Sequence, residues 1–139
     1  MPFKYFGKVN YTPYTKVAAF ADELQKGRLV GSVCRSCGER NFPPRADCLK
    51  CLGGDFELAV VKPEGTLVTF TIIHSAPAGF EDLAPYTLGL VDLDEGGRVR
   101  SWFENAKPDE VKIGMRVRVV PRTFEEIEGI KVYYALEKI

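Results

Sequence analysis

The sequence predicts a mainly β protein with one short N-terminal helix, in which a small metal-holding ribbon precedes a five-stranded Greek-key barrel of the OB type. Four cysteines stand as two Cys-x-x-Cys pairs within residues 34–51, and the chain has no others. Only one segment, near the N-terminus, has helical periodicity. Strand-like runs separated by turn residues fill the chain after residue 64, which suits a small all-β barrel, with a fragment of a β-sandwich as the alternative.

Length and charge divide the chain in two. Its 139 residues suit one domain with an appendage. Residues 1–51 hold 9 Lys+Arg and 4 Asp+Glu, a charge of +5, whereas residues 52–139 hold 10 and 15, a charge of −5. We therefore expect an arm and helix at 1–30, a ribbon at 31–58 and a barrel at 59–139. The zero total charge argues against a general nucleic-acid binder.

The helix is predicted from Pro13 to Lys26. Thr12 is a suitable N-cap before a proline at the first helical position, and Gly27 supplies the stop. Its apolar stripe is Val17, Phe20 and Leu24. Such a stripe needs cover, which either a partner protein or the protein's own ribbon can provide. Residues 1–12 are aromatic and polar and have the composition of an arm that lies on a surface.

The strands are predicted from β-branched residues and alternation. Leu29–Val33 leads into the first cysteine, and Phe56, Leu58 and Val60 alternate after the last one. Residues 94–97, Asp-Glu-Gly-Gly, form a hairpin turn. The five predicted barrel strands are Gly65–Ser75, Tyr86–Leu93, Arg98–Glu104, Met115–Pro121 and Val132–Glu137.

The cysteine spacing, C-x2-C-x10-C-x2-C, predicts a zinc site. Four thiolates match the tetrahedral preference of zinc and leave no position for water, so the ion is expected to be structural. Two disulfides, a rubredoxin-like iron and an iron–sulfur cluster are the alternatives. The predicted ligands are Cys34, Cys37, Cys48 and Cys51.

No catalytic set is evident. The single histidine, His74, ends a strand and is more typical of a rim residue than of a catalyst. Asp92, Asp94 and Glu95 occupy a turn, where acidic residues are common. We therefore expect no catalysis by this chain alone. The first residues lack a secretory apolar stretch and no run is long enough to span a bilayer, so we expect a cytoplasmic protein without a membrane partner.

A series of short motifs runs along nearly the whole chain, and in combination they are specific. In chain order they are Gly27-Arg28-Leu29, Cys34-x-x-Cys37-Gly38, Phe42-Pro43-Pro44-Arg45, Cys48-x-x-Cys51, Glu64-Gly65-Thr66-Leu67, Pro85-Tyr86, Asp92-Leu93-Asp94-Glu95-Gly96 and Ile113-Gly114-Met115-Arg116-Val117. With these motifs the sequence resembles the zinc-ribbon/OB-fold proteins that accompany thiolase-superfamily enzymes, long catalogued as a domain of unknown function and described as acyl-CoA-associated. Two positions depart from that family, because Leu49 and Leu52 stand where it often has proline and glycine.

The resemblance implies a rubredoxin-like zinc ribbon, an OB barrel and a non-catalytic accessory role. The partner would be a thiolase-like or acyltransferase subunit that carries the catalytic cysteine and histidines, in a hetero-oligomer of the kind found in β-oxidation or aromatic degradation. The small subunit would dock on the partner, stabilise it and line part of its CoA channel, so that a CoA thioester is bound jointly.

Several side chains are candidates for contact with the partner or CoA. Arg45 follows a rigid Pro-Pro pair and suits a phosphate or carboxylate, or else neutralises the zinc-thiolate charge. Phe80 and Leu83 lie on the long loop 75–85, where they either meet a partner or fold back over the barrel. Trp102 and Phe103 are adjacent on a strand, so one is expected in the core. The full set is Arg45, Phe80, Leu83, Tyr86, Phe20 and Phe6.

Two other functions fit parts of the sequence. An OB barrel can bind single-stranded nucleic acid, although the acidic charge of residues 52–139 counts against it. A rubredoxin-like electron carrier would hold iron in the same four cysteines. Binding to single strands at low salt identifies the first, and metal analysis identifies the second.

Overall fold

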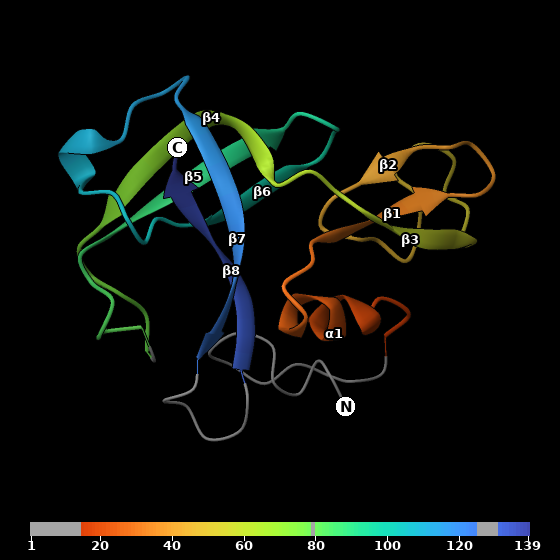
Figure 1. The fold of residues 1–139 in the computed structure, drawn as a ribbon, viewed down its shortest axis with the longest axis horizontal. Coiled ribbons are helices and arrows are strands. Elements are labelled where there is room, and N and C mark those ends of the chain that lie inside the picture. Colours follow the sequence, from red (N-terminus) through yellow and green to blue (C-terminus); the bar gives the residue numbers. More distant parts are fainter. Residues whose placement is uncertain (1–14, 79, 125–130) are drawn as a thin grey trace.

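A computed structural model describes residues 15–78, 80–124 and 131–139 (Figure 1). The predicted Phe6 contact lies outside these residues. Among the described residues the fold is mainly β, with one α-helix, as predicted. The elements are α1 (Ala19–Gln25), β1 (Val30–Cys34), β2 (Arg40–Asn41), β3 (Phe56–Val60), β4 (Glu64–Ile73), β5 (Tyr86–Leu93), β6 (Arg98–Trp102), the 3-10 helix η2 (Pro108–Glu110), β7 (Arg116–Phe124) and β8 (Lys131–Lys138).

The cysteine region folds around a three-stranded antiparallel sheet in the order β2-β1-β3. Strand β1 pairs with β3 over its whole length, from Val30 opposite Val60 to Cys34 opposite Phe56. The two cysteine loops leave this sheet at the end of β1 and after β2, and in Figure 1 they form the right-hand end of the molecule. The sheet is therefore the base that carries the metal-binding loops.

The second sheet has the strand order β6-β5-β4-β7-β8, with antiparallel neighbours. A register shift between Leu67 and Thr69 of β4 allows the sheet to curl. The edge strands meet at a single parallel bridge, Phe103 to Leu136, where the N–H of Glu104 donates to the Leu136 carbonyl at 3.0 Å. The OB topology is thus confirmed. The predicted OB-fold sheet is not closed into a barrel, because its two edges are joined, among the described residues, by this isolated bridge and not by a ladder.

The core of this sheet follows the predicted alternation. Along β5 every second residue from Thr87 to Leu93 is buried, and those between point outward. Phe103 is only 6% exposed, whereas Trp102 faces outward and stacks on Tyr133 with ring centroids 5.2 Å apart. This confirms that one of the two adjacent aromatic residues belongs to the core.

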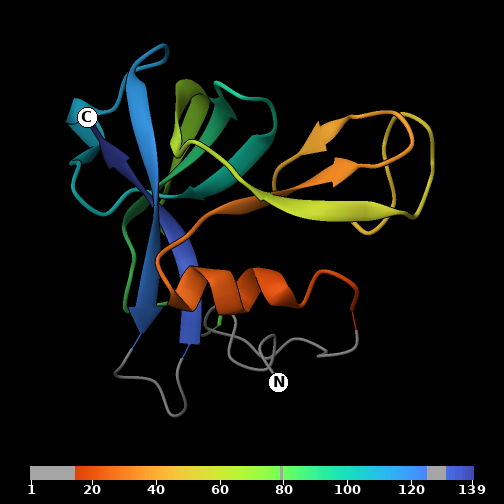
Figure 2. The same cartoon turned by 45° about the vertical axis from the view of Figure 1, so that its right-hand side comes forward.

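Helix α1 is shorter than predicted, but it ends where expected. The N–H of Gly27, at φ +78°, donates to the Leu24 carbonyl at 3.0 Å. The helix packs on β1, β7 and β8 (Figure 1 and Figure 2). Its stripe of Phe20, Ala21 and Leu24 is buried by the protein itself.

Phe20 joins the two sheets. Its ring lies 5.9 Å from that of Phe42, which follows β2, and 6.0 Å from that of Tyr134 on β8. The Phe42 and Tyr134 rings are themselves 5.9 Å apart. With 3% exposure, Phe20 has no surface to offer a partner. The expectation of a partner-facing Phe20 was wrong, because the helix covers its own ribbon and sheet.

The β5–β6 turn also touches the ribbon, which gives a test of how the two sheets dock. Gly96 and Gly97 have φ of +103° and +105°, but a Cβ at Gly97 would lie 2.9 Å from the backbone N and O of Phe42, whereas one at Gly96 would meet nothing within 4 Å. Both alanine variants introduce backbone strain. We expect Gly97→Ala to lose about 1–3 kcal/mol more stability than Gly96→Ala, measured by urea denaturation. Equal losses would show that the turn does not support the ribbon.

No helix among the described residues combines the length and the apolar character needed to cross a bilayer.

Candidate metal centre and its surroundings

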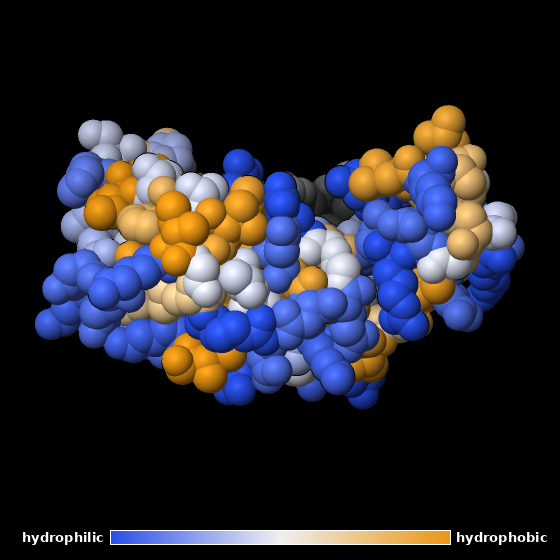
Figure 3. All heavy atoms as spheres, turned by 90° about the horizontal axis from the view of Figure 1, so that it is seen from above, coloured by the Kyte–Doolittle hydropathy of each residue, from blue (hydrophilic) through white to orange (hydrophobic). Residues whose placement is uncertain are grey.

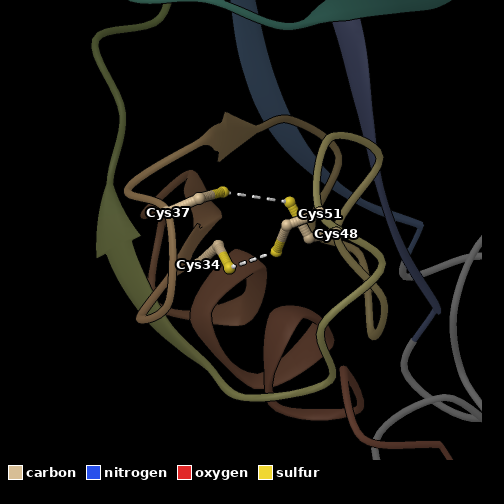
Figure 4. A group of neighbouring side chains, drawn as sticks. All are labelled: Cys34, Cys37, Cys48 and Cys51. Carbon is tan, nitrogen blue, oxygen red and sulfur yellow. Dashed lines mark hydrogen bonds between the residues drawn. The ribbon is translucent and has the colours of Figure 1, made fainter.

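The four cysteines come from two loops with the same local structure, called here the first knuckle (residues 34–38) and the second knuckle (residues 48–52). The N–H of Gly38 donates to the Cys34 carbonyl at 2.9 Å, and the N–H of Leu52 donates to the Cys48 carbonyl at 3.0 Å. Each knuckle therefore returns its second cysteine toward the first. Figure 4 shows the four sulfurs pointing toward one another from the two knuckles.

The sulfur positions fit a tetrahedral ion. All four lie within 4.8 Å of one another, and the pairs Cys34–Cys51 and Cys37–Cys48 are 3.5 Å apart (Figure 4). A zinc ion at 2.3 Å from four sulfurs separates them by about 3.8 Å. A disulfide holds its sulfurs at about 2.05 Å, so these distances do not describe disulfides. The arrangement is positioned for zinc, with all four ligand positions filled by thiolates.

The backbone of each knuckle favours a thiolate at its first cysteine. The N–H of Cys37, together with that of Ser36, lowers the pKa of Cys34 to about 6. The N–H of Cys51 and that of Lys50, which lies 3.3 Å from the Cys48 sulfur, lower the pKa of Cys48. The N–H of Glu39 favours the Cys37 thiolate, but desolvation and the sulfurs of the other three cysteines raise the pKa of Cys37 to about 12. Four ionised sulfurs at this spacing need a cation between them.

Two basic residues of the ribbon, Arg35 and Arg45, have defined positions. Arg35 pairs with Asp55 at 3.1 Å and lies 3.9 Å from Glu57 on β3. The side chain of Arg45 is exposed, and its backbone N–H donates to the Ser32 hydroxyl at 3.0 Å. That bond fixes the Arg45 backbone on β1 and leaves the guanidinium facing solvent.

The second knuckle differs from the first at all three positions that are not cysteine, and two of the replacements are exposed leucines. Gly38 of the first adopts φ +77°, and Leu52 adopts φ +64° at the equivalent position. A left-handed conformation costs a residue with a side chain roughly 1–2 kcal/mol. Leu52 is nevertheless 80% exposed, and Leu49 is 62% exposed. The turn thus forms without glycine, at the expense of backbone strain and an apolar surface.

The remaining candidates lie on the β4–β5 loop and at the start of β5. Phe80, Leu83 and Tyr86 are half-buried, and the loop is closed by bonds from Phe80 N–H to the Pro77 carbonyl and from Leu83 N–H to the Phe80 carbonyl, each 3.0 Å. His74 is exposed. These residues do not converge on the cysteines, which sit in the other sheet.

A surface that sequence reasoning missed is the outward face of β4, β5 and β6. A groove of about 390 Å³ runs there, lined by Thr69, Thr71, Leu88, Leu90 and Arg100 among others. Figure 3 shows apolar side chains on both lobes of the molecule, at the left over the second sheet and at the right over the ribbon. The signal was present in the sequence, because alternation that buries Val91 must turn Leu88 and Leu90 outward.

The acidic residues near the β5–β6 turn are engaged in ion pairs. Arg98 binds Asp92 through two hydrogen bonds and lowers its pKa, and Arg116 does the same for Asp94. These pairs are exposed, so each adds little stability. They brace the sheet edge and do not form a pair of free carboxylates for acid–base work.

A ribbon that presents four converging cysteines, followed by an OB-fold sheet, defines the class of zinc-ribbon/OB-fold proteins. The sequence matches two family profiles, one described as ChsH2, rubredoxin-like zinc ribbon domain, over residues 21–57, and one described as ChsH2, C-terminal OB-fold domain, over residues 59–122. A DUF35 domain-containing scaffold protein of Methanocaldococcus jannaschii is 37% identical over 99 residues, which cover 70% of each chain. This chain belongs to the DUF35 family.

Two further relatives bear functional names. Benzoylsuccinyl-CoA thiolase subunit BbsA of Thauera aromatica is 33% identical over 78 residues, 56% of this chain and 53% of that protein. A solved chain of an Ltp2-ChsH2(DUF35) aldolase superposes with a TM-score of 0.73 and 25% identity, over 92% of this chain and 98% of that one. The shared architecture therefore spans nearly the whole molecule.

Proposed function

We propose that this protein is a non-catalytic accessory subunit of a thiolase-like acyl-CoA enzyme complex. The observation that carries the proposal is the likeness, over almost the full chain, to the DUF35 component of an aldolase complex, together with the likeness to a thiolase subunit. Bond-making then belongs to the larger partner, in a cytoplasmic hetero-oligomer.

In this role the four cysteines hold a structural zinc. When bound, zinc supplies cross-linking of the two knuckles and no chemistry toward a substrate, because a tetrathiolate site has no open position. Cys34 and Cys48 are buried and anchor the site to the ribbon, whereas Cys37 and Cys51 are exposed. The ribbon is too small to bury a core of its own, so its shape depends on this cross-link.

The partner and a CoA thioester would meet the exposed and half-buried candidates. Arg45 presents a guanidinium to solvent, suited to a phosphate or a carboxylate. Phe80, Leu83 and Tyr86 present apolar surface on the long loop and the start of β5. We propose that these residues contact the catalytic subunit and line the entrance of its CoA channel, and the same role is proposed for Phe6 on the N-terminal arm.

Co-expression with a thiolase-superfamily chain from the same genome tests the proposal. We expect the two chains to co-purify as a hetero-oligomer, and acyl-CoA turnover to require the partner and to be absent from this chain alone. Metal analysis should give one zinc and no iron per chain. A monomer that binds neither the partner nor acyl-CoA would contradict the proposal, and salt-sensitive binding of single-stranded DNA would favour the nucleic-acid alternative.

A further inference from the structure

We propose that the apolar tip of the second knuckle, Leu49 and Leu52, is the point at which the ribbon inserts into the catalytic partner. The inference rests on the proposed function and adds the docking surface, which no relative's name specifies. Leu49 and Leu52 are among the most exposed large apolar residues of the described chain, at 62% and 80%. They flank Lys50 and Cys51 on one turn of the chain.

The first knuckle provides an internal comparison. The residue after its first cysteine is Arg35, paired with Asp55, and the residue after its second cysteine is Gly38. The equivalent positions of the second knuckle are Leu49 and Leu52. Both knuckles make the same closing hydrogen bond, so folding requires neither leucine. Arg35 and Gly38 show that a polar residue and a glycine suit these two positions of a knuckle when only its own folding matters.

In the isolated protein, both the backbone conformation and the exposure of the side chain of Leu52 are unfavourable. Its backbone adopts φ +64°, a region that favours glycine. Its side chain stays 80% exposed and therefore gains little from the protein's own core. Strain retained at an exposed apolar residue is a feature of interaction sites, where a partner buries the side chain. We therefore infer that the Leu52 side chain is buried by a partner in a complex.

The charges beside the tip indicate the chemistry of the partner surface. The side chain of Lys50, which lies between the two leucines in the sequence, is exposed. The complementary surface is an apolar recess on a protein, with an aspartate or glutamate placed to meet Lys50. A membrane suits the tip less well, because two leucines bury little apolar area and the carboxylates of Asp47 and Asp55 are exposed nearby.

The metal site makes the tip a rigid anchor. Leu49 follows Cys48 and Leu52 follows Cys51, so an ion held by the four sulfurs would fix the backbone of both leucines. A side chain presented in one orientation loses little conformational freedom on binding. A small number of such anchors supplies most of the affinity of a typical interface.

Variants that separate folding from docking test this inference in the complex with the thiolase-superfamily subunit. We expect Leu52→Gly and Leu49→Ser each to weaken binding by about tenfold or more, measured by isothermal titration calorimetry. Leu52→Gly should leave the melting temperature unchanged or higher, because glycine relieves the strain, and zinc content should stay at one per chain. Leu52→Asn, which tolerates the left-handed region, should also weaken binding. Ile113→Ser removes another exposed apolar residue and is the control.

The outcomes are distinct. If wild-type protein binds the partner and both leucine variants bind equally well, the docking surface is wrong and the proposed function stands. If Leu52→Gly melts well below wild type, Leu52 is structural and the inference fails. If Ile113→Ser weakens binding as much as the knuckle variants, binding depends on general surface hydrophobicity and the inference also fails.

Leucine-dependent binding to phosphatidylserine vesicles, or leucine-dependent self-association, would show that the tip binds a membrane or a second copy of the chain and not the catalytic partner. If wild type binds no thiolase-like subunit, the proposed function and the docking surface fall together.

Discussion

Replacing Cys34 by serine is expected to release the zinc and unfold the ribbon. Cys34 is buried at the end of β1, and its sulfur lies 3.5 Å from that of Cys51, in the other knuckle. A structural zinc site contributes on the order of 10 kcal/mol to the folding of a small metal-dependent unit. Serine is a poor zinc ligand, so most of that contribution is lost. The measurements are zinc content per chain and the loss of strand signal in circular dichroism.

Ser36→Ala is the matched control for this variant. Ser36 lies in the same knuckle and its side chain is exposed, so zinc content and spectrum should stay those of wild type. Loss of the ribbon should also abolish binding of the catalytic partner, whereas the second sheet should retain its own core. A Cys34→Ser protein that keeps one zinc and its melting temperature would show that the four sulfurs do not act together. Iron in the native protein would favour the electron-carrier alternative.

The ribbon could be predicted well from the sequence because its constraint is local. Two Cys-x-x-Cys pairs permit few arrangements around one ion, and Gly38 supplies the left-handed residue that the first knuckle requires. The strands were equally readable, since alternation along β5 places Val91 in the core and Leu90 outside. The turn at Gly96 and Gly97 fixed the β5–β6 hairpin.

The errors concern contacts between distant parts of the chain. Barrel closure depends on whether the two edges of the sheet align. The isolated bridge between Phe103 and Leu136 joins residues far apart in the chain, so the local pattern of apolar and polar residues does not predict it. The cover of the helix depends on Phe42 and Tyr134, which stand 22 and 114 residues after Phe20 in the sequence. An amphipathic stripe predicts that one helix face is buried but does not identify the residues that cover it.

Phe20→Ala is expected to destabilise the protein strongly, because this side chain packs the helix against both sheets. The ring is 3% exposed and packs against Phe42 of the ribbon and Tyr134 of β8. Removal of a buried phenylalanine ring costs about 3–5 kcal/mol, because it leaves a cavity among side chains that cannot fully collapse. For a chain of this size the melting temperature should fall by roughly 10 °C or more, measured by calorimetry.

Comparison variants separate packing from partner contact. Val17→Ala, at a half-buried position just before α1, should cost about 1 kcal/mol or less. Phe20→Leu should fall between Phe20→Ala and wild type, since it restores part of the apolar volume. The Phe20 ring packs on Phe42 and Tyr134 and supplies no zinc ligand, so Phe20→Ala should keep its zinc, unlike Cys34→Ser. If Phe20→Ala instead melts like wild type and loses only the partner, the helix stripe is an interface after all, and the three-ring cluster does not join the ribbon to the OB sheet.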